Sequence, residues 1–209
     1  MLHWIGFAFI AVACGMSVRW AILRHMGSRA AFPWMAVPIL TLMGCLAVMP
    51  WFFRVRLENR LSDAASQISG RDVFVQCQSF AGAFFDPSAH LGHVAFDAAG
   101  RAEPRTLIKR DQCRDLSGYV ASDKETPTAE QVIAVHVLTH ESIHMAGTAA
   151  EWEAECLAVR NDQRMAELLG ASSTAAANLA HSYWTDVYPN MPAKYRSTEC
   201  RPFEGLAGS

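Results

Sequence analysis

The sequence predicts an α+β fold: two N-terminal transmembrane helices, then a small domain with a short antiparallel sheet and several helices. Three observations indicate it. Two long apolar stretches begin the chain, short segments rich in β-branched and aromatic residues follow, and apolar helix-like segments fill the C-terminal half. The 209 residues are 51% hydrophobic, with the excess at the N-terminus. We therefore expect a transmembrane anchor over residues 1–56 and a folded domain over residues 57–209.

The two apolar stretches are each long enough to cross a bilayer as a helix. Residues 2–23 are nearly all apolar and residues 31–53 carry no charge, while about 20 apolar residues span the hydrocarbon. The first stretch lacks a charged n-region and a clear cleavage site, which favours an anchor over a cleaved signal peptide. Two buried core helices of a soluble protein are the alternative. The lipid bilayer is thus an expected partner.

Charge and cysteine content bear on which side of the membrane the domain occupies. No Lys or Arg precedes the first span, whereas Arg19, Arg24 and Arg29 lie between the spans. This asymmetry favours a cytoplasmic loop and an extracytoplasmic domain. The second span is followed by basic residues that argue the other way: Arg54, Arg56 and Arg60.

The folded domain contains four widely spaced cysteines: Cys77, Cys113, Cys156 and Cys200. Two disulfides formed in an oxidising compartment explain this even number most simply. Of the three possible pairings we prefer Cys77–Cys113 with Cys156–Cys200, because each pair joins neighbouring segments. Four reduced thiols in a cytoplasmic domain are the alternative.

A helix over 54–69 and a modest β region are expected after the second span. Residues 72–77 are strand-like, and residues 93–96 and 106–108 flank a turn at Gly100 and predict a hairpin. A mostly apolar helix is then expected over about 128–146. Thr128 and Gln131 can form a capping box at its start, and Gly147 is a natural stop.

The second half of that helix carries the motif H-E-x-x-H, spelled His140-Glu141-Ser142-Ile143-His144. On a helix this spacing places two imidazoles one turn apart on one face, where both can bind one Zn²⁺. Glu141 is then close enough to reach a metal-bound water. Burying these three polar groups is costly unless a metal or partners satisfy them. The alternative is a solvated face with two surface histidines.

A catalytic zinc site needs a third protein ligand and an open position. A second helix is expected to run to about residue 169, and on it Glu151 and Glu155 share a face. Either carboxylate could return to the metal. His136 is four residues before His140, which is too far for direct ligation because each such step rises about 6 Å. It is expected to pack in the core, with a flanking role as the alternative.

Residues 126–170 resemble the gluzincin type of zinc metallopeptidase, in which a Glu on the following helix completes the site. Ala150 stands where the metzincin pattern has a third His, which excludes that group. More loosely, the layout resembles small membrane-anchored metallopeptidases of actinobacteria, which read H-E-[SA]-x-H-x-x-G-x-x-x-E followed by a Cys. In that pattern the last Glu matches Glu151, so Glu151 ranks above Glu155 as the expected third metal ligand.

The resemblance implies a zincin-like fold, a Zn²⁺ cofactor, a peptide or protein substrate and Glu141 as general base. Sites of this type often use a His or Tyr to stabilise the oxyanion. His181 and Tyr183, in a helical stretch over 173–188, are the candidates here, with aromatic core packing as the alternative. A net charge of −2 gives no basic face for nucleic acid. The second functional interpretation is a non-enzymatic membrane protein with a structural or vestigial metal site and a partner-binding ectodomain.

Overall fold

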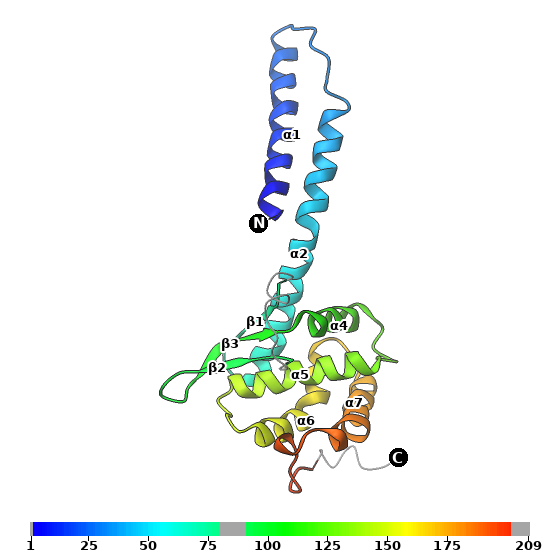
Figure 1. Cartoon of the computed structure of the whole chain (residues 1–209). Helices are drawn as coiled ribbons and strands as arrows, with labels where there is room; N and C mark the ends of the chain where they lie inside the picture. The colour runs from blue at the N-terminus through cyan, green and yellow to red at the C-terminus, as the bar shows by residue number, and fades with distance from the viewer. Residues whose placement is uncertain (1, 80–90, 202–209) are drawn as a thin grey trace. The chain divides into compact units, whose positions relative to one another are not determined.

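The computed structural model describes residues 2–79 and 91–201, and the chain divides into two compact units, Met1–Arg56 and Leu57–Ser209 (Figure 1). The first unit contains helix α1 (Leu2–His25) and the beginning of helix α2 (Ala36–Ser69). The two helices approach closely where two glycines meet. A Cβ atom added to Gly6 would lie 2.9 Å from the carbonyl oxygen of Gly44. Small residues allow such close helix packing in membranes.

Both helices are long and apolar enough to cross a membrane. Their most apolar windows have mean hydropathies of 1.8 and 1.9, and only 11% and 6% of these windows is buried in the protein. A core helix of a soluble protein would be mostly buried. The helix expected over 54–69 is confirmed, and it forms the C-terminal part of α2, which continues into it from the second span without a break. The second span begins at Ala36 rather than Ala31, after Pro33. Pro38 is tolerated in the first helical turn, where backbone N–H groups have no partner within the helix.

In the second unit, the described residues form a mixed three-stranded sheet in the order β1-β3-β2. Its strands are β1 (Phe74–Cys77), β2 (Val94–Phe96) and β3 (Ala102–Ile108). The hairpin of β2 and β3 is antiparallel, as predicted, but β1 pairs with β3 in parallel. The expectation of a wholly antiparallel sheet is therefore wrong. A tight turn forces antiparallel pairing, whereas the long connection from β1 to β2 leaves β1 free to add beside β3 in the parallel sense.

Helices make up most of the rest of the second unit. Helix α5 (Ala129–Met145) lies among them and has packing neighbours on several sides (Figure 1). These neighbours are the sheet and the helices α4 (Arg110–Ala121), α6 (Glu151–Leu168) and α7 (Ser173–Ser182). The sequence analysis missed α4, which is mostly polar and buries only a narrow stripe that includes Leu116 and Tyr119. Beyond α7 the chain continues as short π and 3₁₀ turns over Tyr183–Val187, Tyr188–Asn190 and Ala193–Tyr195.

Local signals set the ends of α5, and two disulfides tie the segments around it. The capping box of Thr128 and Gln131 is present at its start. Gly147 follows its end with φ of +116°, a conformation that glycine adopts without strain. Among the described residues the disulfides are Cys77–Cys113, joining β1 to α4, and Cys156–Cys200, joining α6 to the C-terminal segment. These are the pairs that the sequence analysis preferred.

Candidate metal centre

The two histidines of the motif face each other in the interior. His140 and His144 lie one turn apart on α5, and their Nε2 atoms are 2.9 Å apart. Both side chains are buried because α5 is covered by the sheet and by α6. The Nδ1 atom of His144 lies 2.6 Å from the carbonyl oxygen of Thr148, which accepts its hydrogen. That bond leaves Nε2 of His144 with a free lone pair for a ligand.

Glu151 completes a triangle of donor atoms. It is the first residue of α6, directly after the chain reverses at Gly147. Its Oε2 atom lies 3.3 Å from Nε2 of His140 and 3.4 Å from Nε2 of His144. Ligands about 2.0–2.1 Å from a tetrahedral zinc ion would be about 3.3–3.4 Å from one another. The two edges to Glu151 match this spacing, and the edge between the two histidines, at 2.9 Å, is shorter, so the three donor atoms come close to the spacing that one such ion needs.

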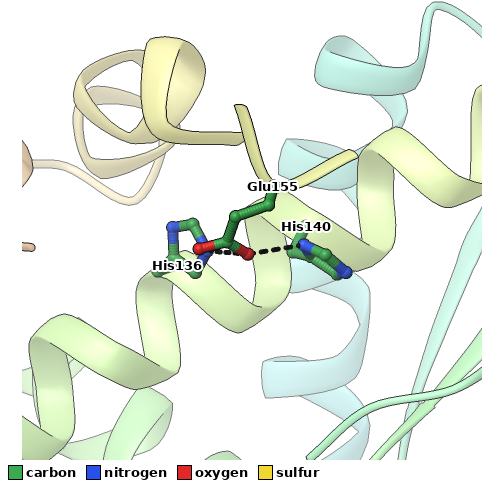
Figure 2. A group of neighbouring side chains, drawn as sticks. All are labelled: His136, His140 and Glu155. Atoms are coloured by element: carbon green, nitrogen blue, oxygen red, sulfur yellow. Dashed lines mark hydrogen bonds and ion pairs between the residues drawn. The ribbon is translucent and has the colours of Figure 1, made fainter. Parts of the chain in front are cut away.

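Glu155 faces the opposite nitrogen of His140. Its Oε2 atom is 3.1 Å from Nδ1 of His140 and 3.1 Å from Nε2 of His136 (Figure 2). The contact with His140 has the distance of a hydrogen bond but not its ideal angle, and this buried nitrogen has no other acceptor among the described residues. Glu151 thus lies at the paired Nε2 atoms and Glu155 behind His140. The ranking of Glu151 as third ligand stays a prediction.

Glu141 lies on the side of α5 that faces the sheet. The hydroxyl of Thr106, on β3, is 3.4 Å from its Oε2 atom and 3.1 Å from the carbonyl oxygen of His93. Backbone also presses on the carboxyl group, since a Cβ atom at Gly92 would lie 2.6 Å from Oε1 of Glu141. Only glycine permits this approach. Burial raises the pKa of Glu141 to about 7 because it disfavours the charged form.

The other carboxylates of the site are held in the charged form by histidines. Hydrogen bonding to His140 lowers the pKa of Glu151 to about 2. Burial by itself would raise the pKa of Glu155, but the charge of His136 and hydrogen bonds with His136, His140 and Tyr183 hold it well below its usual range. Two ionised carboxylates that both contact His140 favour binding of a cation at this site.

A cavity of about 580 Å³ opens beside the donor atoms. The three donor residues and Glu141 line it, and the rest of its wall is largely apolar, with contributions from α5, the β2 segment and the C-terminal turns. Tyr195 is among these residues, and its ring lies edge-on to His140 with centroids 6.0 Å apart. The centre is therefore open on one side to a space that can hold part of a substrate.

The two candidate oxyanion stabilisers, Tyr183 and His181, have different surroundings. Tyr183 is buried and lines the cavity, but its hydroxyl donates to Oε1 of Glu155 at 2.6 Å, and its ring stacks on His136. His181 is exposed near the end of α7 and is not among the residues that line the cavity.

Sequence reasoning missed several residues that shape the centre. They are Gly92, Thr106, Asp162 and Tyr195. The i, i+4, i+8 row of histidines was a signal for His136, whose buried partners lie far away in sequence. Nothing in the local pattern singles out Thr106 or Tyr195, because each reaches the centre through tertiary packing.

The described residues contain two His/Glu groups that could hold a metal ion: His140 with His144 and Glu151, and His136 with His140 and Glu155. Comparisons with protein-family models, curated proteins and solved structures find no match to the chain.

Proposed function

We propose that the chain is a membrane-anchored, zinc-dependent metallopeptidase. The observation that carries this proposal is the triangle formed by Nε2 of His140, Nε2 of His144 and Oε2 of Glu151, with edges of 2.9, 3.3 and 3.4 Å. Two imidazoles and one carboxylate are a donor set that catalytic zinc sites use. Glu141 is buried beside this triangle and lines the same cavity.

The open side of the centre favours a catalytic over a structural role. Structural zinc sites surround the ion with four protein ligands, whereas catalytic sites keep one position for water or substrate. The group at His140, His144 and Glu151 offers three ligand atoms among the described residues, and it opens into the cavity of about 580 Å³. A cavity of this size accepts several atoms of a peptide on either side of a scissile bond.

Glu141 is the general base in this proposal. Zinc, when bound, polarises the substrate carbonyl and lowers the pKa of a coordinated water towards 7. The Glu141 carboxylate accepts the proton of the attacking water and delivers it to the leaving amine. Thr106 and the backbone at Gly92 restrict the movement of the Glu141 side chain, which supports a fixed position for the proposed base.

The location of the reaction follows from the anchor and the disulfides. Helices α1 and α2 are long, apolar and largely exposed, which suits a lipid bilayer as their surroundings. Cys77–Cys113 and Cys156–Cys200 suit an oxidising compartment. We therefore place the catalytic unit on the extracytoplasmic side of the cell membrane, with peptide or protein segments as its substrate.

The substitution Glu141→Gln tests the function directly. It keeps the shape of the side chain but removes the base, so the full chain purified in detergent should keep its zinc and lose at least 100-fold of its peptide hydrolysis. The alternative, a non-enzymatic membrane protein with a structural or vestigial metal site, predicts zinc without hydrolysis in both proteins. A folded wild-type chain that binds no zinc would contradict the proposal.

A further inference from the structure

A buried group of side chains behind His140 has no part in the reaction proposed above. His136 on α5 lies between two carboxylates of α6: its Nδ1 atom is 2.8 Å from Oδ2 of Asp162, and its Nε2 atom is 3.1 Å from Oε2 of Glu155. The side chains of His136, Glu155 and Asp162 are at most 4% exposed. A polar group this deeply buried is costly unless its hydrogen bonds are all made.

The contacts favour one arrangement of hydrogens. Each nitrogen of His136 lies within hydrogen-bond distance of a carboxylate oxygen, which favours a ring with a hydrogen on both nitrogens, an imidazolium. The pKa of His136 agrees: burial by itself lowers it, but the charges of Asp162 and Glu155 together with their hydrogen bonds raise it to about 10. Glu155 accepts from His136 at Oε2 and from Tyr183 at Oε1, so its carboxyl group is fixed at both oxygens.

The fixed carboxylate then faces His140. Its Oε2 atom, already bonded to His136, is also 3.1 Å from Nδ1 of His140 (Figure 2). This contact is within ion-pair distance but is not an aligned hydrogen bond. The nearby carboxylate favours a hydrogen on Nδ1, which leaves the lone pair of the ring on Nε2, the nitrogen that faces His144 and Glu151.

We propose that His136 and Asp162 are positioning residues for the metal centre. They hold Glu155 in the orientation that accepts the hydrogen on Nδ1 of His140, and Nε2 of His140 is thereby presented to the ion. The inference rests on the proposed metal at His140, His144 and Glu151. It assigns His136, Asp162 and Glu155 to support of a ligand and not to a second ion, because both nitrogens of His136 are already bonded.

The test uses the full chain in detergent, labelled with ¹⁵N at its histidines, with and without added Zn²⁺. In the wild type we expect one zinc per chain and a ring N–H signal from Nδ1 of His140 that exchanges slowly with water. In His136→Gln this signal should exchange faster, and zinc affinity should fall 10–100-fold. The matched control is Thr139→Val on the same helix, whose buried hydroxyl bonds only the carbonyl of Val135 in the structure. It should leave both quantities unchanged.

A second variant covers the case in which His136→Gln does not fold. The double change His136→Leu with Asp162→Leu replaces this buried ion pair by apolar side chains of similar volume, a replacement that is often tolerated in protein interiors, while Glu155 keeps its bond from Tyr183. Unchanged zinc affinity and an unchanged Nδ1 signal in a folded variant would overturn the inference, as would two zinc ions per wild-type chain. Absence of zinc from the wild type would instead contradict the proposed function, and the Nδ1 signal of the metal-free chain would still test the positioning role.

Discussion

The Oε2 atom of Glu151 lies 3.4 Å from Nε2 of His144, although the two residues belong to different helices. The chain reverses between them at Gly147, which adopts φ of +116°. Because α6 starts at Glu151 itself, its first side chain points back to the end of α5 that carries His144. The centre thus depends on a tight turn as well as on the motif.

We predict that the purified full chain binds one zinc ion and that His140→Ala or His144→Ala abolishes tight binding. Each substitution removes a donor atom of the triangle, and two donors hold zinc far more weakly than three. Elemental analysis of folded protein measures this. Wild-type protein without metal after incubation with Zn²⁺ would show that the triangle is not a metal site.

The third ligand can be identified by comparing two carboxylates. Glu151→Ala should reduce zinc affinity by more than 100-fold, because it removes a ligand, whereas Glu155→Ala should reduce it 10–100-fold through loss of support for His140. The exposed Glu153 on the same helix provides the control, and Glu153→Ala should have no effect. Titration with Zn²⁺ against a competing chelator gives the three values. A larger loss in Glu155→Ala than in Glu151→Ala would exchange the two assignments.

Gly92→Ala should lower peptide hydrolysis while zinc binding is kept. A Cβ atom at this position would overlap the carboxyl group of Glu141, at 2.6 Å from Cγ and from Oε1, so this carboxyl group, the proposed base, must move. Displacement of a catalytic group by about 1 Å can reduce the rate about 100-fold. Gly15→Ala is the control, because nothing lies within 4 Å of a Cβ atom there. Equal rates for the wild type and Gly92→Ala would mean that the backbone at residue 92 does not position Glu141.

The side of the membrane can be tested through the cysteines of the second unit. An impermeant thiol reagent applied to intact cells should label Cys77, Cys113, Cys156 and Cys200 only after reduction, because the structure pairs them in disulfides. Mass spectrometry locates the labels. Labelling without reduction, and only in opened cells, would indicate reduced thiols on the cytoplasmic side and reverse the predicted orientation.

Features set by neighbouring residues could be predicted from the sequence. The capping box at Thr128 and Gln131, the stop at Gly147 and the spacing of His140 and His144 each involve residues within one or two helical turns. The two apolar spans could also be predicted, because length and composition suffice to identify a helix that can cross a membrane. Such patterns can be identified because helix geometry alone determines which side chains share a face.

Features that join segments distant in the sequence could not be predicted from it. The parallel pairing of β1 with β3, the bond of Thr106 to Glu141 and the bond of His136 to Asp162 each link residues from separate elements. Helix α4 was missed because its buried stripe is narrow and its composition is polar.

The sequence by itself therefore determined that this protein has two apolar N-terminal helices. It also determined that a buried helix in the second unit carries His140, Glu141 and His144. Only the tertiary structure decided that Glu151 lies at the Nε2 atoms and Glu155 at Nδ1 of His140. The physical reason is that Glu151 and Glu155 share one face of α6, so helix periodicity alone does not separate them, and only the motif resemblance ranked Glu151 first. The angle and spacing at which α6 packs on α5 place one carboxylate on each side of the same imidazole ring.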